Sequence, residues 1–138
     1  MKRLLFLLTS LLFINCSKNP ETFIKHLNGY WEIEEVTLND GSKKQYNYND
    51  TIDYINVTDS LSGIRKKLKP NFEGTYKTSN NAENFKIVIE NDSLNLYYST
   101  PFTKWKETIL NASQDQLLVI NSNKDMYLYK RYQPIIIE

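Results

Sequence analysis

The chain has 138 residues, of which 17 are Lys or Arg and 16 are Asp or Glu, so its formal net charge is only +1. This length is enough for one domain and not for two. The near-neutral balance argues against a nucleic-acid binder, which would carry a concentrated basic excess. The single cysteine, Cys16, excludes an internal disulfide, so the fold must rest on its apolar core. Ten Tyr, six Phe and two Trp favour β-strands.

The N-terminal segment is the first element along the chain. Lys2 and Arg3 precede an apolar run over residues 4–14, which is shorter than the ~20 apolar residues of a membrane span but fits the core of an export signal. An export signal that ends at a cysteine resembles a bacterial lipoprotein precursor. The resemblance implies a lipoprotein signal peptide over residues 1–15 and a lipid on Cys16. The alternative is an ordinary secretory signal with an incidental cysteine, but no A-x-A-like cleavage site follows.

The same resemblance predicts where the protein works. Residues 16–19 would form a lipidated polar tether, and residues 20–138 a single domain held at a membrane through the N-terminal lipid. The expected location is the cell envelope, at the outer membrane, on its periplasmic face or on the cell surface. An acylated Cys16 would be neither a nucleophile nor a metal ligand.

A short helix and a series of short strands are predicted after the tether. Asn19 is a favourable helix cap, Pro20 suits the first helical position and Glu21 suits the first turn, so a helix is expected over residues 20–28, ending at Gly29. Strands separated by turn residues follow. Their expected ranges are 29–38, 51–58, 63–69, 72–78, 84–90, 93–100, 103–111, 116–121 and 126–132.

This order of elements predicts an all-β fold. Eight or nine short strands with tight links favour an up-and-down antiparallel β-barrel over a sandwich, with the one short N-terminal helix as a cap. Residues 20–138 would all belong to that barrel domain.

Gly29-Tyr30-Trp31, directly after the helix, resembles the G-x-W signature of lipocalins. The resemblance implies that Trp31 points into the closed end of the barrel, and that a basic residue of the last strand, here Arg131, lies across the indole. Such a cation–π pair contributes roughly 0.5–2 kcal/mol. Gly29, Trp31 and Arg131 are therefore the expected structural kernel.

A wider resemblance covers nearly the whole mature chain. The blocks LNGYWEI (27–33), GIRKKLKP (63–70), YSTPF (98–102), WKET (105–108) and YKR (129–131) are similar to small lipocalin-like lipoproteins of Gram-negative bacteria. That family has no agreed ligand, so the resemblance implies a fold and a location but no activity. Most of the blocks would serve equally well as packing residues and turns.

Strand alternation divides the side chains between lumen and exterior. If the aromatic face is the inner one, the lumen carries Trp31, Tyr98, Trp105, Tyr127 and Tyr129 together with Glu35, Arg65, Glu107 and Arg131. Buried charges must be paired or hydrated, which leaves two interpretations open. Arg65 and Arg131 pair with Glu107 and Glu35 as internal braces, or Arg65 or Lys67 holds the anionic or hydroxyl-bearing end of a small amphiphile. The candidate ligand contacts are Arg65, Lys67, Tyr98, Trp105 and Tyr129.

The sequence offers little for catalysis. His26 is the only histidine and has no metal-ligand partner at suitable spacing. Alternation splits Glu32, Glu34 and Glu35 across two faces, and no paired acid of a glycosidase is linked to them. We expect no catalytic residue, no metal and no cofactor, and therefore no enzyme.

Three short segments resemble the Asp-Ser/Thr-aliphatic acceptor for O-glycosylation that some Gram-negative bacteria use on exported proteins. They place the acceptor hydroxyl at Thr51, Ser60 and Ser93. Asp-Ser and Asp-Thr are also ordinary turn residues, and this is the alternative interpretation.

Two functions follow as hypotheses. The first is a membrane-anchored binding lipoprotein that carries or sequesters a small amphiphilic or aromatic molecule in the barrel. The second is a non-catalytic structural or protein-interaction module of the cell envelope, with a filled barrel and an envelope protein as partner. An apolar-walled pocket of ~300 Å³ or more in the lumen would favour the first, and a packed interior the second.

Overall fold

The computed structural model describes residues 19–78 and 81–134, so the signal segment and Cys16 lie outside the described residues. The described chain forms one short helix and ten strands. They are α1 (Glu21–Leu27), β1 (Gly29–Thr37), β2 (Lys43–Gln45), β3 (Ile52–Val57), β4 (Ser62–Pro70), β5 (Tyr76–Thr78), β6 (Glu83–Glu90), β7 (Ser93–Ser99), β8 (Lys104–Ala112), β9 (Gln116–Asn121) and β10 (Met126–Arg131).

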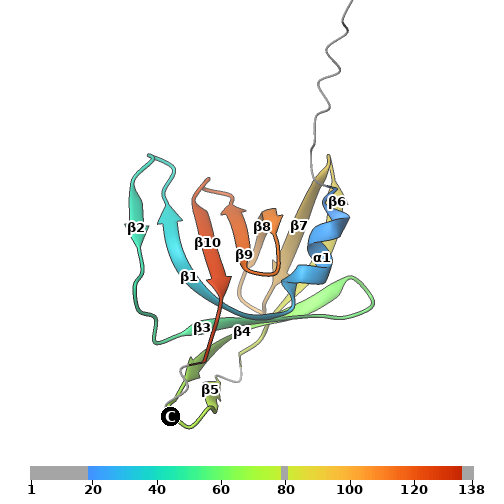
Figure 1. The fold of residues 1–138 in the computed structure, drawn as a ribbon. Helices are drawn as coiled ribbons and strands as arrows, with labels where there is room; N and C mark the ends of the chain where they lie inside the picture. The colour runs from blue at the N-terminus through green and yellow to red at the C-terminus, as the bar shows by residue number, and fades with distance from the viewer. Residues whose placement is uncertain (1–18, 79–80, 135–138) are drawn as a thin grey trace, which may run out of the picture.

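The strands β1, β3, β4 and β6 to β10 close into an antiparallel barrel (Figure 1). Each pairs with its neighbour along the chain, and β1 pairs with β10 to close the ring, with Trp31 opposite Arg131. Two short strands lie outside this ring: β2 extends the edge of β1, and β5 pairs with the end of β4. The predicted all-β, up-and-down antiparallel barrel is confirmed.

The secondary structure differs from the prediction in two places. The β2 strand was not expected, because its side chains Lys43–Gln45 are all polar and exposed and carry no apolar alternation. The strand expected over residues 72–78 forms only as Tyr76–Thr78. Its first half is a turn, because the Asn71 side-chain carbonyl accepts hydrogen bonds from the backbone N–H groups of Glu73 and Thr75, both at 3.0 Å.

The α1 helix covers one end of the barrel, where it contacts β3 and β8 (Figure 1). It begins as the sequence indicates, since the Asn19 side-chain oxygen accepts a hydrogen bond from the Glu21 N–H at 3.1 Å. Phe23 and Leu27 are buried beneath it. The helix stops before Gly29, whose φ of +122° favours glycine over any residue with a side chain.

Large side chains from nearly every barrel strand fill the lumen near the helix. Leu27, Trp31 and Leu94 are completely buried, and the cluster around them continues with Phe23, Ile55, Phe85, Ile87, Leu96, Tyr98, Ile109, Ala112, Leu117, Val119 and Tyr129. The barrel therefore encloses a packed core, one of the two arrangements found in eight-stranded barrels, whose interior is either filled by side chains or holds one small ligand.

A β-bulge in β1 corrects one predicted orientation. The pairing of β1 with β10 shifts between Ile33 and Glu35, so the alternation that starts at Trp31 is reset by one residue. Ile33 packs on the core as expected, but Val36 is the next buried residue. Glu35 instead pairs with Lys43 of β2 at 3.4 Å and does not brace Arg131 inside the lumen.

Candidate functional site

Trp31 and Arg131 seal the helix-closed end of the barrel. The Trp31 indole is 0% exposed and its N–H donates a hydrogen bond to the Leu27 carbonyl at 2.9 Å. The expected contact with Arg131 is present, with the guanidinium carbon 3.7 Å from the ring centroid. Arg131 also donates to the carbonyls of His26, at 3.1 Å, and Asn28, at 2.7 Å. It thereby satisfies carbonyl groups that the end of a helix leaves without an intrahelical partner.

The conformation of Gly29 follows from this arrangement. A Cβ atom at Gly29 would lie 2.6 Å from the Arg131 Nη1 atom, a separation that real side chains do not tolerate. Glycine is therefore favoured by its positive φ, and a larger residue would also displace the end of the Arg131 side chain.

A second arginine, Arg65, lies inside the barrel and is only 8% exposed. Its Nε and Nη2 atoms contact the Asp53 carboxylate, each at 3.3 Å. Its Nη1 contacts the Glu107 carboxylate at 3.1 Å and the Tyr98 hydroxyl at 3.3 Å. Its Nη2 donates to the Tyr129 hydroxyl at 2.7 Å. Four of these five contacts are hydrogen bonds, and the Nη2 contact with Asp53 is an ion pair, so most of the five N–H donors of the guanidinium are satisfied within the protein.

The contacts of Arg65 favour the interpretation of this residue as a brace. A ligand at its depth would have to displace a partner, and buried polar groups are costly to leave unpaired. Charges also balance, because Arg65 and Lys67 face Asp53 and Glu107. Lys67 is bound to Asp53 at 2.6 Å, although its side chain is 61% exposed.

The network sets the protonation of its members. Burial alone would raise the pKa of Asp53, but the nearby charges of Arg65 and Lys67 outweigh it and lower that pKa. Burial raises the pKa of the Tyr129 hydroxyl to about 12, against the opposing effect of Arg65. The pKa of Tyr98 is raised even further, again because of burial. Both phenols therefore stay neutral even at moderately alkaline pH, and their oxygens accept hydrogen bonds from Arg65.

The five candidate ligand contacts fall into two groups. Arg65, Tyr98 and Tyr129 are buried parts of the interior network. Trp105 is half-buried and stacks on Tyr98, with ring centroids 4.9 Å apart and planes 4° from parallel. Lys67 and Trp105 are thus the two members that reach the surface.

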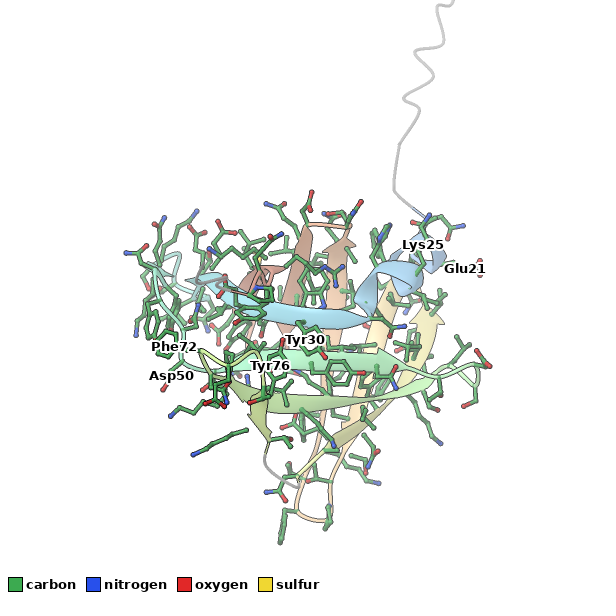
Figure 2. The ribbon with its side chains drawn as sticks, turned by 60° about the horizontal axis from the view of Figure 1, so that its bottom comes forward. Glu21, Lys25, Tyr30, Asp50, Phe72 and Tyr76 are labelled. Carbon is green, nitrogen blue, oxygen red and sulfur yellow. The ribbon has the colours of Figure 1, made fainter. Side chains whose placement is uncertain are left out.

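A separate groove, here called the aromatic groove, lies on the outside of the barrel. Its volume is about 310 Å³, and three stretches far apart in sequence form it: residues 47–50, residues 69–76 and residues 132–134, with Glu32 of β1 between them. Figure 2 shows Asp50 beside Phe72 at this site, and Tyr76 beside Tyr30. The Tyr30 and Tyr76 rings stack with centroids 5.2 Å apart, which fixes the inner wall.

The rim of the aromatic groove combines exposed rings with paired charges. Tyr48 and Phe72 are each 79% exposed. Asp50 pairs with Lys69 at 3.7 Å. At the opposite wall Glu32 pairs with Lys130 at 3.5 Å. None of the five candidate contacts lines this groove.

A second, more open cavity of about 650 Å³ crosses β4, β6, β7 and β8. Phe85 and Tyr98 point into the core, so alternation directs their neighbours Lys86 and Tyr97 outward. The cavity therefore lies on an outer face rich in lysine, and Tyr98 and Trp105 contribute to its wall.

The predicted acceptor hydroxyls lie at turns and strand starts. Thr51 and Ser60 are exposed and Ser93 is half-buried. The Thr51 hydroxyl donates to the Asp50 carboxylate at 3.1 Å, and the hydroxyl oxygens of Ser60 and Thr58 are 3.2 Å apart. Their modification stays a prediction.

Two further observations concern residues 19–78 and 81–134 alone. No group of three or more His, Cys, Asp or Glu side chains in these ranges is arranged to hold a metal ion. No helix in the same ranges has the length and apolar character needed to cross a membrane.

Sequence reasoning missed Asp53 and the aromatic groove. Asp53 had a usable signal, since it alternates with Ile55 and Val57 along the strand and therefore shares their apolar face. An acid on an apolar face predicts a buried cationic partner. The groove had no local signal, because its aromatic residues come from a loop, a turn and the C-terminal stretch.

Comparison with known proteins gives a matching family and similar solved structures. Residues 27–119 match the model of the lipocalin-like domain. A lipocalin-like protein from Bacteroides uniformis and an uncharacterized protein from Bacteroides eggerthii are each 10% identical to this chain, with TM-scores of 0.48. The first alignment covers 78% of this chain, the second 77%, and each covers 99% of the solved chain. Among curated proteins, none matches significantly.

Proposed function

This chain belongs to the lipocalin-like domain family, whose barrel suggests ligand binding in general, and on that premise we propose a non-catalytic binding protein of the cell envelope. It is anchored through a lipid on Cys16 and recognises a small molecule on the surface of a filled barrel. The observation that supports surface recognition is the contrast between a packed, internally paired lumen and an external groove of about 310 Å³. Ligand pockets of proteins begin at about this volume.

Because the lumen is filled, we expect the ligand to bind at the surface of the barrel and not inside it. Arg65 makes five contacts within the protein, and its two tyrosine partners are core residues. A carrier that enclosed its ligand would need to open this network. A ligand held at the barrel opening by Lys67 and Trp105, or in the aromatic groove, needs no such change.

The proposed lipid on Cys16 would lie close to the α1 helix. Asn19, the cap of α1, is three residues from Cys16, a span of at most about 11 Å. A lipid on Cys16 would therefore hold the helix-closed end near the membrane. In Figure 2, Asp50 and Phe72 of the aromatic groove lie on the side of the molecule opposite Glu21 and Lys25 of α1. The groove would then face away from the membrane.

Replacement of the cysteine tests the anchor. Cys16→Ala in the full-length precursor should move the protein from the detergent phase to the aqueous phase in phase partition, because the acylated thiol is lost. Ser17→Ala, which keeps the cysteine, is the matched control and should stay in the detergent phase. Unchanged partition of Cys16→Ala would remove the anchor from the proposal.

The second candidate is an envelope protein as partner of a filled barrel. Two observations favour it: the packed interior, which is the outcome expected for an interaction module, and the outer face of β6 and β7, where Val88 and Tyr97 are exposed beside Lys86. Exposed apolar groups with a charged surround are typical of protein contacts.

Native mass spectrometry of the full-length protein, purified from its own host, distinguishes the two candidates. We expect a retained small molecule, released when the protein is denatured. Recovery of a stoichiometric protein partner with no small molecule would reject the ligand-binding proposal in favour of the interaction module.

A further inference from the structure

We propose that the aromatic groove binds a neutral pyranose sugar, as one or two rings of a carbohydrate. The inference rests on the proposed function, in which recognition occurs on the surface of the barrel, and it names the chemical class of the ligand.

The first observation is the exposure of two aromatic rings at a concave site. Tyr48 and Phe72 each leave 79% of their surface in water at the rim of the groove. Ligand pockets are typically lined by apolar and aromatic side chains with a few polar groups, and two exposed rings at one hollow fit this description. The faces of these rings carry the negative part of the aromatic quadrupole, and they attract the slightly positive C–H groups on the flat face of a pyranose.

The second observation is the balance of charge. The two acids of the groove both have a lysine within 4 Å: Asp50 faces Lys69 at 3.7 Å and Glu32 faces Lys130 at 3.5 Å. The charged lining residues are Glu32, Asp50 and Lys69, and Lys130 beside the groove offsets the second acid, so the site holds no strong excess of either charge. Each carboxylate still has lone pairs beyond the one directed at its lysine, because an ionised carboxylate accepts about four hydrogen bonds. Hydroxyl groups of a neutral ligand can use these acceptors without disturbing either pair.

The third observation is the mixture of polar groups between the rings. The Asn47 amide and the Tyr132 and Tyr76 side chains also line the groove. A hydroxylated ring can satisfy such donors and acceptors along its edge while its face lies on an aromatic ring. A fatty chain or a bare aromatic molecule would desolvate these polar groups without replacing their hydrogen bonds, which is unfavourable.

The size and position agree with this class. A groove of about 310 Å³ lies at the lower limit of ligand pockets, of roughly 300 Å³, and so suits a small part of a larger carbohydrate. The groove is open at its rim, where the exposed rings lie, so a longer chain could extend into solvent.

The test uses the full-length lipidated protein in a non-glycosidic detergent, titrated with neutral disaccharides of glucose, mannose, galactose and N-acetylglucosamine. Calorimetry measures Kd, and glucuronic acid and indole serve as the charged and the planar aromatic probes. We expect at least one disaccharide to bind, glucuronic acid to bind more weakly, and Phe72→Ala to weaken the binding by about tenfold.

The matched control is Phe102→Ala. Phe102 is 96% exposed and lies outside the groove, so this variant removes the same kind of ring without changing the site. Both rings are largely exposed, so both variants should fold. The control should leave Kd unchanged within about twofold.

Three results would overturn the inference: no disaccharide binds at roughly 10 mM, indole binds more tightly than every disaccharide, or Phe72→Ala and Phe102→Ala give the same Kd. A small molecule retained in the native mass spectrum would then leave the proposed binding function intact, and only the carbohydrate class would fall. If that spectrum is also empty, both proposals are rejected.

Discussion

The helix-closed end of the barrel and the aromatic groove use aromatic side chains in opposite ways. At the closed end the Trp31 ring is completely buried, its N–H is hydrogen-bonded and a guanidinium covers its face. In the groove Tyr48 and Phe72 leave most of their surface in water. The first arrangement stabilises the fold, and the second contributes little to it. In the proposed function, stability and recognition are thus separated in space, with the barrel as a support for the surface site.

The largest expected difference between the two regions is in folding stability. Trp31→Ala should lower the free energy of unfolding by about 3–5 kcal/mol, because it removes a large buried ring and leaves a cavity. Phe72→Ala should change it by less than about 0.5 kcal/mol, because that ring is exposed. Urea unfolding followed by circular dichroism measures both. Equal losses in the two variants would show that the groove is part of the folding core.

The interior network should also be important for stability. Arg65→Met leaves the buried Asp53 and Glu107 without their shared cation and should cost about 3–5 kcal/mol, towards the lower value because Lys67 still contacts Asp53. Adding Asp53→Asn removes one buried charge and should restore part of the loss. The same urea experiment applies. A cost below about 1 kcal/mol for the single variant would show that Arg65 is not a structural brace.

Alkaline pH should weaken the interior network. The pKa of Tyr129 is about 12 in the fold and has an ordinary value of 10.0. Between these values the unfolded chain loses a proton that the folded chain keeps, so the free energy of unfolding falls as pH rises, by up to ~1.4 kcal/mol per pH unit, and is unaffected below pH ~10. Tyr129→Phe should make this slope shallower without abolishing it, because the pKa of Tyr98 is raised too. An unchanged slope would contradict the assignment.

The smallest expected effect compares two glycines with positive φ. Gly29 has a φ of +122° and Gly41 a φ of +88°, but only at Gly29 would a Cβ meet another residue, the Arg131 guanidinium at 2.6 Å. In both alanine variants the positive φ lowers the free energy of unfolding. Gly29→Ala should lower it by a further ~0.5–2 kcal/mol, the range of the cation–π contact that the new Cβ would disturb. Thermal unfolding of the two variants gives the difference. No difference would mean that Arg131 shifts freely and does not hold the closed end.

Most of the fold could be predicted because its signals are local. Asn19 and Pro20 mark the helix start, and turn residues separate runs of strand formers, so the barrel strands were found within a few residues. The errors have physical causes. The β2 strand consists of exposed polar residues that only the edge of β1 holds in place, and the Asn71 side chain replaces strand pairing by a turn.

The site was less predictable than the fold. Alternation placed Arg65, Tyr98 and Tyr129 together correctly, because the strands that carry them keep a regular register. It failed for Glu35, because a bulge adds one residue to β1 and reverses the face of everything after it.

The sequence by itself determined the export pattern at Cys16, the strand order and the kernel of Gly29, Trp31 and Arg131, since each depends on neighbouring residues or on a short motif. Only the tertiary structure decided that Asp53 shares Arg65 with Glu107, that the lumen is full, and that an aromatic groove forms outside the barrel. These features depend on strand register and on contacts between segments far apart in the chain. Local propensity and alternation carry no information about either.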